Sequence, residues 1–424
     1  MGVMTARRVL AAAVAVGLAS PAAASPGNGI RFGGSAGRLH PFLELETRYD
    51  SNVSYLATGE RVGDLVLMVR PGFELAAPGE LAAVQLRAAL SWAQYLGLQG
   101  DTSDLSRLYG EASLGFGLNR RGAVGLELTD NFRRSASLQA LSIGAALISN
   151  TNELRLAVPW RPGGGALLVT TSGEWRLETF EPYLEGALCL ADTPACDPDQ
   201  VADLGYNELR GGLEVSWKFL PRTALVLEGN YFTRVPNADT GGADGSGARV
   251  WTGVTGLFSA RIAGTIKGGY GDTLGSLGEA YRTWLANAEV EWLPLETARV
   301  KAGYVHDYGL DPGQSTLFGE SALFSSHRLY AEGRVLMAGR YTFRLTGQYE
   351  RRTYELVSST SADLIRGEPS VEVELARWLR AGIGYAFTRR TTELPAAALT
   401  GTGTTLPGYD YDKSEGWLRL SATY

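Results

Sequence analysis

The sequence predicts an all-β protein: a single transmembrane antiparallel β-barrel of about 18 strands, with short periplasmic turns and long extracellular loops. Three observations lead to this prediction. Segments of roughly ten or more residues alternate apolar and polar side chains. Tight turns recur along the chain, and longer stretches rich in Gly, Asp, Asn, Ser and Thr lie between them.

The hairpin SVEVELARWLRAGIGYAF, residues 370–387, shows the alternation clearly. One face of both predicted strands is wholly apolar, whereas the other face carries Glu372, Glu374 and Arg380. We therefore expect the apolar face to meet lipid and the charged face to meet water inside the barrel. A closed barrel also pairs every backbone N–H and C=O without leaving a sheet edge in the lipid.

The strand count follows from eight tight turns, each flanked on both sides by an alternating segment. They lie at residues 77–80, 119–122, 161–164, 220–223, 259–261, 293–296, 337–340 and 376–379. One further strand is predicted at each end, near 40–49 and 416–424, which places both termini on the short-turn side and nine long loops opposite. In residues 250–270 the Gly and Thr content leaves the facing of the strands open.

Two soluble alternatives fit less well. A β-propeller also repeats at about 40 residues, but each of its blades needs four short strands. Here each repeat holds two long strands, of the length that a tilted strand needs to cross a bilayer. A soluble β-sandwich closes over its core with far fewer strands than the number predicted here to have one apolar face.

Composition restricts the class of protein further. The chain has 424 residues, a mean hydropathy of −0.06 and 20% charged residues, which argues against disorder and against a helical membrane protein. The net charge of −6 and the absence of a basic run argue against a nucleic-acid partner.

The chain begins with the three parts of a secretory signal peptide: Arg7 and Arg8, then an apolar run from Val9 to Leu18, then Ala22-Ala23-Ala24. We expect cleavage after this triplet. The predicted division is a signal peptide (1–24), a short periplasmic segment (25–37) and the transmembrane barrel (38–424).

The C-terminus resembles the assembly signal of outer-membrane barrels, which implies recognition by the barrel-assembly machinery. Its residues share one face of the last strand and end in an aromatic: Gly416, Leu418, Leu420, Ala422 and Tyr424.

The inward face of the predicted barrel carries interleaved acids and arginines. A barrel of this size is wide enough for an aqueous channel or a plug. For any single charged residue in this set, the simpler explanation is an Arg–carboxylate pair that stabilises the hydrated interior of the barrel. The predicted pore-lining residues are Glu44, Glu46, Arg48, Arg70, Arg87, Arg107, Glu111, Glu127, Arg155, Glu208, Arg210, Glu214, Glu289, Glu291, Arg299, Arg328, Glu332, Arg344, Glu372, Glu374, Arg380 and Arg419.

Five aromatic residues also fall on the lumenal side: Tyr95, Tyr109, Tyr281, Tyr330 and Trp417. Flat rings stack on sugar faces, so these residues could guide a saccharide. Ordinary packing near the strand ends is the alternative.

Cys189 and Cys196 are the only cysteines, and we expect a disulfide between them in an oxidising compartment. No metal site or cofactor is predicted. The three histidines, His40, His306 and His327, lie in no catalytic motif, so the chain is not expected to be an enzyme. Asp50 and Asn52 could suggest calcium ligation, but a loop-opening turn explains them better.

The first predicted strand runs into Tyr49, Asp50, Ser51, Asn52 and Val53. With the signal peptide, the hairpins and the terminal aromatic, this motif resembles the outer-membrane β-barrel porin family associated with bacterial exopolysaccharide export. The resemblance implies an integral outer-membrane channel that passes a secreted polysaccharide, with periplasmic export components as partners. The guiding helical-repeat domain of such systems is not found in this chain.

The sequence therefore favours a channel in the bacterial outer membrane that passes hydrophilic cargo through a charged aqueous lumen. The resemblance favours an exopolysaccharide as this cargo. A general diffusion porin, a barrel-borne lipid or polymer hydrolase, and an adhesive barrel with a closed lumen stay open as alternatives.

Overall fold

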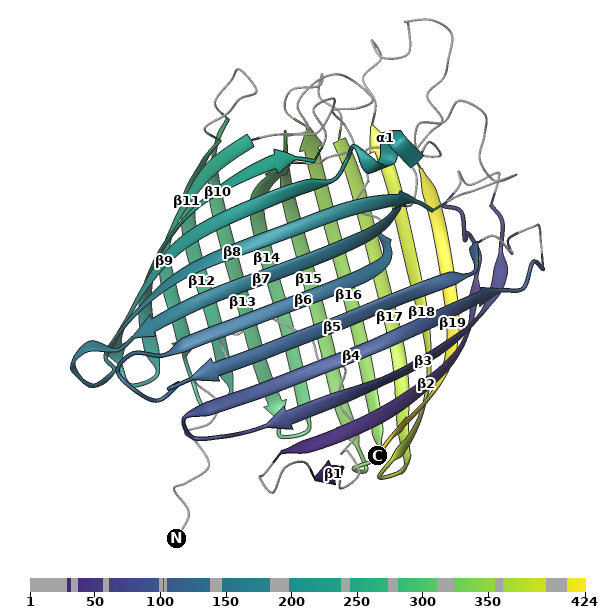
Figure 1. The fold of residues 1–424 in the computed structure, drawn as a ribbon, viewed down its shortest axis with the longest axis horizontal. Coiled ribbons are helices and arrows are strands. Elements are labelled where there is room, and N and C mark those ends of the chain that lie inside the picture. The colour runs from purple at the N-terminus through teal and green to yellow at the C-terminus, as the bar shows by residue number, and fades with distance from the viewer. Residues whose placement is uncertain are drawn as a thin grey trace, which may run out of the picture.

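The computed structural model describes residues 29–31, 37–55, 61–98, 102, 105–137, 147–183, 198–237, 245–273, 281–310, 323–354, 361–393 and 410–424. Within this part of the chain, β2 to β19 form one closed antiparallel barrel in which each strand pairs with its sequence neighbours (Figure 1). The last strand pairs with β2 and closes the sheet. The predicted fold class is confirmed.

The strands alternate in direction around the barrel and are 12–16 residues long. They are β2 (Arg38–Asp50), β3 (Asp64–Ala77), β4 (Ala82–Tyr95), β5 (Arg107–Leu118), β6 (Leu126–Ser137), β7 (Leu147–Trp160), β8 (Leu167–Pro182), β9 (Tyr206–Leu220), β10 (Thr223–Pro236), β11 (Gly245–Leu257), β12 (Ile262–Thr273), β13 (Arg282–Leu295), β14 (Ala298–Leu310), β15 (Leu323–Met337), β16 (Tyr341–Tyr354), β17 (Ser361–Ala376), β18 (Leu379–Glu393) and β19 (Tyr411–Thr423).

All eight predicted tight turns join consecutive strands at one end of the barrel, which we call the turn end. The segment 250–270 forms a hairpin: the second half of β11, a tight turn and most of β12. In the β15–β16 turn, Ala338 and Gly339 take φ of 50° and 65°, the left-handed conformation that lets so short a connection reverse the chain. The longer connections lie at the opposite end, the loop end.

The barrel is sealed where β19 meets β2. Arg419 lies directly opposite Glu46 in this pairing, and the backbone N–H of Tyr424 donates to the carbonyl of Pro41 at 3.0 Å. His40 Nδ1 lies 2.9 Å from the carbonyl oxygen of Tyr424. The short strand β1 (Ile30–Arg31) pairs with the beginning of β2, so residues from the predicted periplasmic segment extend the sheet at the turn end (Figure 1).

The outer surface of the barrel is apolar and bounded by aromatic side chains. On β13, Trp284 and Trp292 are 53% and 48% exposed, and they point outward with Ala288 midway between them. Eight residues of strand span about 27 Å, or about 20 Å across a membrane at the usual tilt of about 40°. This height fits the apolar band of an outer-membrane barrel.

Most outward-facing charges lie beyond this band at the loop end, although Asp130 on β6 faces outward between Leu114 and Leu154. Arg134 donates to Glu181 at 2.8 Å, and Arg351 lies 3.8 Å from Asp363. Ion pairs of this kind suit the headgroup region and not the hydrocarbon core, because a charge facing lipid is costly at depth.

The interior has local apolar clusters at the loop end instead of one continuous core. One of them contains Val201 and Leu204, next to the five-residue helix α1 (Pro198–Ala202). Within the described residues, no helix has the length and apolar character needed to span a membrane.

Candidate functional site: the charged inner wall

The inner wall is built by the residues that alternate with the lipid-facing ones. On β2, for example, Leu43 and Leu45 are more than 40% exposed outward, whereas Glu44 and Glu46 lie on the opposite face. The strand register carries this alternation around the barrel and places all the predicted pore-lining residues on the inner wall.

A first ion-pair network crosses β2 to β5. Arg70 lies 3.1 Å from Glu44 and also contacts Glu111. Arg87 lies 3.3 Å from the same Glu111 carboxylate and contacts Glu74. The two arginines therefore share Glu111, and the ion pairs connect four neighbouring strands. The Glu111 and Glu74 side chains stay about one-third exposed.

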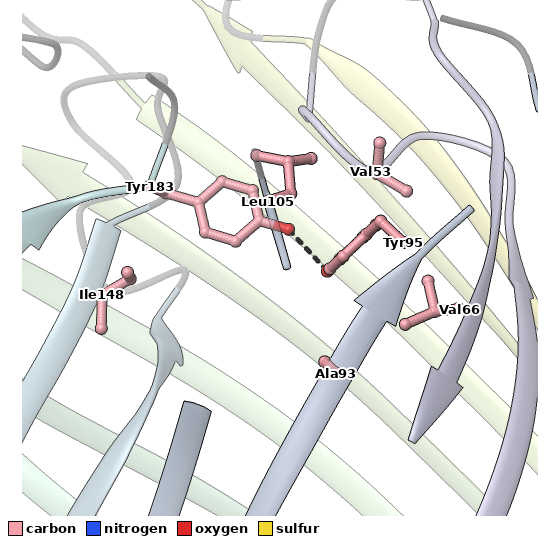
Figure 2. Packing of buried hydrophobic residues seen from close by; sticks show 7 residues of the cluster. All are labelled: Val53, Val66, Ala93, Tyr95, Leu105, Ile148 and Tyr183. Carbon is pink, nitrogen blue, oxygen red and sulfur yellow. Dashed lines mark hydrogen bonds between the residues drawn. The ribbon is translucent and has the colours of Figure 1, made fainter. Parts of the chain in front are cut away.

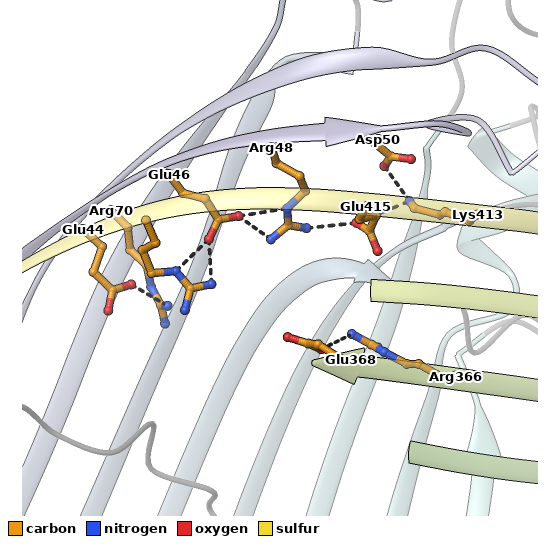
Figure 3. Close-up of polar contacts among 10 residues, drawn as sticks. Glu44, Glu46, Arg48, Asp50, Arg70, Arg366, Glu368, Lys413 and Glu415 are labelled. Atoms are coloured by element: carbon orange, nitrogen blue, oxygen red, sulfur yellow. Dashed lines mark hydrogen bonds and ion pairs between the residues drawn. The ribbon is translucent and has the colours of Figure 1, made fainter. Parts of the chain in front are cut away.

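A second network follows the seam between β2 and β19 (Figure 3). Glu46 accepts from Arg48 at 2.8 Å and lies 2.6 Å from Arg419. Arg48 reaches Glu415 at 3.1 Å. Because these contacts join the first barrel strand to the last, they stabilise the closure on the inside.

The most buried part of this network is the Lys413–Asp50 pair. The Lys413 Nζ lies 2.7 Å from Asp50 Oδ2, and both side chains are almost fully buried. Lys413 also sits over the Tyr55 ring, 3.9 Å from its centroid. The pair thus links the end of β2 and the loop after it to β19.

The Asp50–Asn52 motif forms a turn. Asp50 Oδ1 accepts the backbone N–H of Asn52 at 2.9 Å, and the Asn52 side chain, which is fully buried, donates to the carbonyl of Asp412. The Asp50 Oδ1 contact is the one that opens such a turn, and Asp50 Oδ2 pairs with Lys413. Within the described residues no group of three or more His, Cys, Asp or Glu could hold a metal ion.

A third network lies on the far wall, at the loop end of β8 to β10. Glu208 is 4% exposed and lies 2.9 Å from Arg234 and 2.7 Å from Arg210. Tyr206 donates to the buried Glu178 at 2.5 Å, and the Arg234 guanidinium stacks over the Tyr206 ring at 3.9 Å. Acid and base are again matched almost one to one.

Apolar side chains pack together at the loop end on the β2–β8 side (Figure 2). Val53 and Leu105, from two different connections, pack with Tyr95 and Tyr183 as fully or nearly fully buried residues. The two tyrosine hydroxyls lie 2.9 Å apart. Burial raises the pKa of Tyr183, which therefore stays neutral.

Asp64 holds the connection between β4 and β5 against the wall. Its buried carboxylate accepts the backbone N–H groups of Gly97 and Leu98, both at 3.0 Å, and the Thr102 hydroxyl at 2.5 Å. The described part of this connection is therefore anchored next to the start of β3, beside the apolar cluster of Figure 2.

The predicted sugar-stacking aromatics lie in different surroundings. Trp417 is 7% exposed, lies over Gly384 on the next strand, where a Cβ would clash with the indole, and carries the Arg419 guanidinium 4.6 Å from its ring centroid. Tyr95 is 8% exposed within the cluster of Figure 2.

The other three aromatics are partly buried. Tyr109 packs against the edge of the same cluster, Tyr281 packs against the cluster around Phe232, and Tyr330 donates to Glu289. Protein contacts thus account for all five rings, and a role in saccharide stacking stays a prediction.

The histidines form no hydrolase arrangement among the described residues. His306 and His327 lie opposite each other on the outward face of β14 and β15, with stacked rings 4.2 Å apart. His327 Nδ1 pairs with the Tyr304 hydroxyl at 2.8 Å, and His306 Nδ1 lies 3.1 Å from the carbonyl oxygen of Ser326. The Thr283 hydroxyl lies 3.3 Å from His306 Nε2, but within the described residues no G-x-S-x-G turn accompanies this contact.

Several inner-wall residues were not predicted. Lys413 and Glu415 precede the predicted start of the last strand, which in fact begins at Tyr411. Arg234 and Glu178 lie at the loop ends of β10 and β8, where polar residues interrupt the apolar alternation. Extending each alternating segment by four or five residues towards its loop would have found all four.

Two predictions fall on residues outside the described part. Cys189 and Cys196 lie there, so their disulfide stays a prediction, and so does the signal peptide at 1–24. The proposed C-terminal signal is described: Leu418, Leu420 and Tyr424 face outward and are exposed. Its recognition by assembly machinery also stays a prediction.

No protein-family model and no curated protein sequence matches the chain. Among solved structures it is similar to the outer membrane protein OpdK from Pseudomonas aeruginosa, with 11% identity, a TM-score of 0.45, and coverage of 91% of this chain and 99% of that one. OccK3 (OpdO) from the same organism gives 10% identity and a TM-score of 0.44, covering 91% and 95%. The siderophore receptor PirA, also from Pseudomonas aeruginosa, gives 9% and 0.44, covering 92% and 81%. Likeness at this level concerns barrel architecture alone and gives no information on cargo.

Proposed function

We propose that the protein is an outer-membrane channel that passes hydrophilic cargo, and that this cargo is a secreted exopolysaccharide. The observation that carries this proposal is the charged lattice on the inner wall. Partly exposed acids and arginines such as Glu44, Arg70 and Glu111 require water within the barrel, because charges buried in a dry interior would be far more costly. Selection would come from pore width and from the lumenal field, without chemistry.

The proposal includes an orientation. Both termini lie on the periplasmic side with the turn end, and the long connections face outside. The barrel-assembly machinery and periplasmic export components are the expected partners. The exopolysaccharide as cargo comes from the Tyr49–Val53 motif and the resemblance it carries, and the lattice itself fits any hydrophilic solute.

Single-channel conductance in planar bilayers tests the proposal. The full mature chain should give stable openings, and a polysaccharide added on the turn-end side should reduce the current. Current that small sugars and polymers leave unchanged would instead indicate a general diffusion porin. Absence of conductance over a range of voltages would contradict the channel.

A further inference from the structure

Three arginines stand in a row across the inner wall at the turn end. Arg299 lies at the start of β14, Arg334 near the end of β15 and Arg344 near the start of β16. The register makes Arg299 and Arg334 direct cross-strand partners, and Arg334 and Arg344 likewise. With strands about 4.8 Å apart, the row extends over about 10 Å.

This row is an unfavourable arrangement for the protein by itself, because like charges directly opposite one another on a sheet repel. Arg299 is offset by Glu291 at 2.7 Å. The Nε of Arg344 is buried and has no hydrogen-bond acceptor among the described residues, and the nearest Glu332 oxygen is 3.7 Å away. Arg334, between the two, makes no ion pair or side-chain hydrogen bond with any residue that the structure describes. The row therefore has guanidinium N–H donors and positive charge that the surrounding acids do not compensate.

The rim around the row is also cationic. The eight short turns carry Arg120, Arg121, Arg161, Arg222, Arg261, Arg340 and Arg377, against only Glu80 and Glu296. The connections at the other end contain fifteen acids and one arginine, in a chain whose net charge is −6. Positive charge is thus concentrated at the turn end, where it would attract anions towards the mouth of the barrel.

We propose that Arg299, Arg334 and Arg344 form an anion-binding site at the turn-end mouth, and that it takes the acidic groups of a carboxylate-bearing saccharide cargo. Guanidinium groups bind carboxylates through paired, charge-assisted hydrogen bonds. The row faces the lumen, so lipid headgroups cannot reach it. Its extent suits several acidic groups on one chain better than a single small anion. The saccharide part of this assignment rests on the proposed function.

Calorimetric binding of hexagalacturonate to the full mature protein in detergent tests the site. Maltohexaose serves as the neutral oligosaccharide, and galacturonate monomer and inorganic phosphate serve as small anions. The variant is Arg334→Gln, which removes a repelled charge and should fold normally. The matched control is Arg328→Gln, on the same strand and face but opposite Glu350.

The expected result is that hexagalacturonate binds, that its affinity falls as salt rises, and that maltohexaose does not bind. Arg334→Gln should weaken binding roughly tenfold, the loss expected for one charge-assisted contact, whereas Arg328→Gln should change it less than about twofold. Equal binding by Arg334→Gln and wild type would overturn the site. Galacturonate or phosphate binding as tightly as the hexamer would overturn the assignment to an acidic saccharide chain.

This experiment does not need a conducting pore, so it separates the two proposals. Conductance without hexagalacturonate binding would reject the anion site and leave the channel standing. Binding without conductance would support the site and reject the channel.

Discussion

Replacing Lys413 by Met tests whether the seam depends on its buried ion pair. The substitution keeps the length and most of the apolar volume of the side chain but removes the charge. Asp50 then loses the partner at 2.7 Å, although its side chain is only 6% exposed. The Tyr55 ring loses the cation that lies over it.

The expected cost can be worked from this geometry. At 2.7 Å and an effective dielectric constant of about 20, the attraction amounts to roughly 6 kcal/mol. Desolvation of both ions offsets much of that attraction when the pair forms, but removing one partner leaves the other buried and uncompensated, which typically costs about 3–5 kcal/mol. We expect Lys413→Met to fall in that range. The double variant Asp50→Asn/Lys413→Met should cost at least about 1 kcal/mol less than the sum of the single variants.

Urea unfolding of the protein refolded into lipid vesicles, followed by tryptophan fluorescence, gives these free energies. The control is Arg366→Met, which breaks the more exposed Arg366–Glu368 pair in the same lumen (Figure 3) and should cost less than about 1 kcal/mol. Equal losses for Lys413→Met and Arg366→Met, or strict additivity in the double variant, would refute the reasoning about the seam.

Two further predictions concern the exterior and the loop end. Ile266 faces outward directly opposite Ala288, midway between the two tryptophans of β13. Ile266→Arg should therefore destabilise the barrel by about 2–4 kcal/mol in the same unfolding assay. The inward-facing Thr265→Arg should cost much less, and equal costs would contradict the assigned facing. Asp64→Ala removes the acceptor for two backbone N–H groups and a hydroxyl, so amide hydrogens in the described part of residues 96–102 should exchange at least tenfold faster, whereas exchange in β13 should not change. Unchanged exchange in 96–102 would show that other contacts hold this connection.

Much of the candidate site could be predicted from the sequence because the side-chain period of a strand is exactly two. Once Leu43 and Leu45 are assigned to lipid, Glu44 and Glu46 must face the lumen, and the same step applies on every strand. The facing is harder to predict where the apolar alternation weakens. Lys413 lies between the polar Asp412 and Ser414, and Arg234 follows the polar Thr233.

The partners of each charge could not be predicted, because they depend on register and barrel closure between distant segments. Arg419 meets Glu46, 373 positions away in the chain, only because β19 pairs with β2. Arg334 lies between two other arginines only because two hairpin registers align them. The sequence by itself determined the approximate number of barrel strands, the tight turns and the facing of residues in the clearly alternating segments, since these are local patterns that lipid and water impose. Only the tertiary structure decided which charges neutralise one another and which are left over, since side chains far apart in the sequence meet through the closed hydrogen-bond ladder.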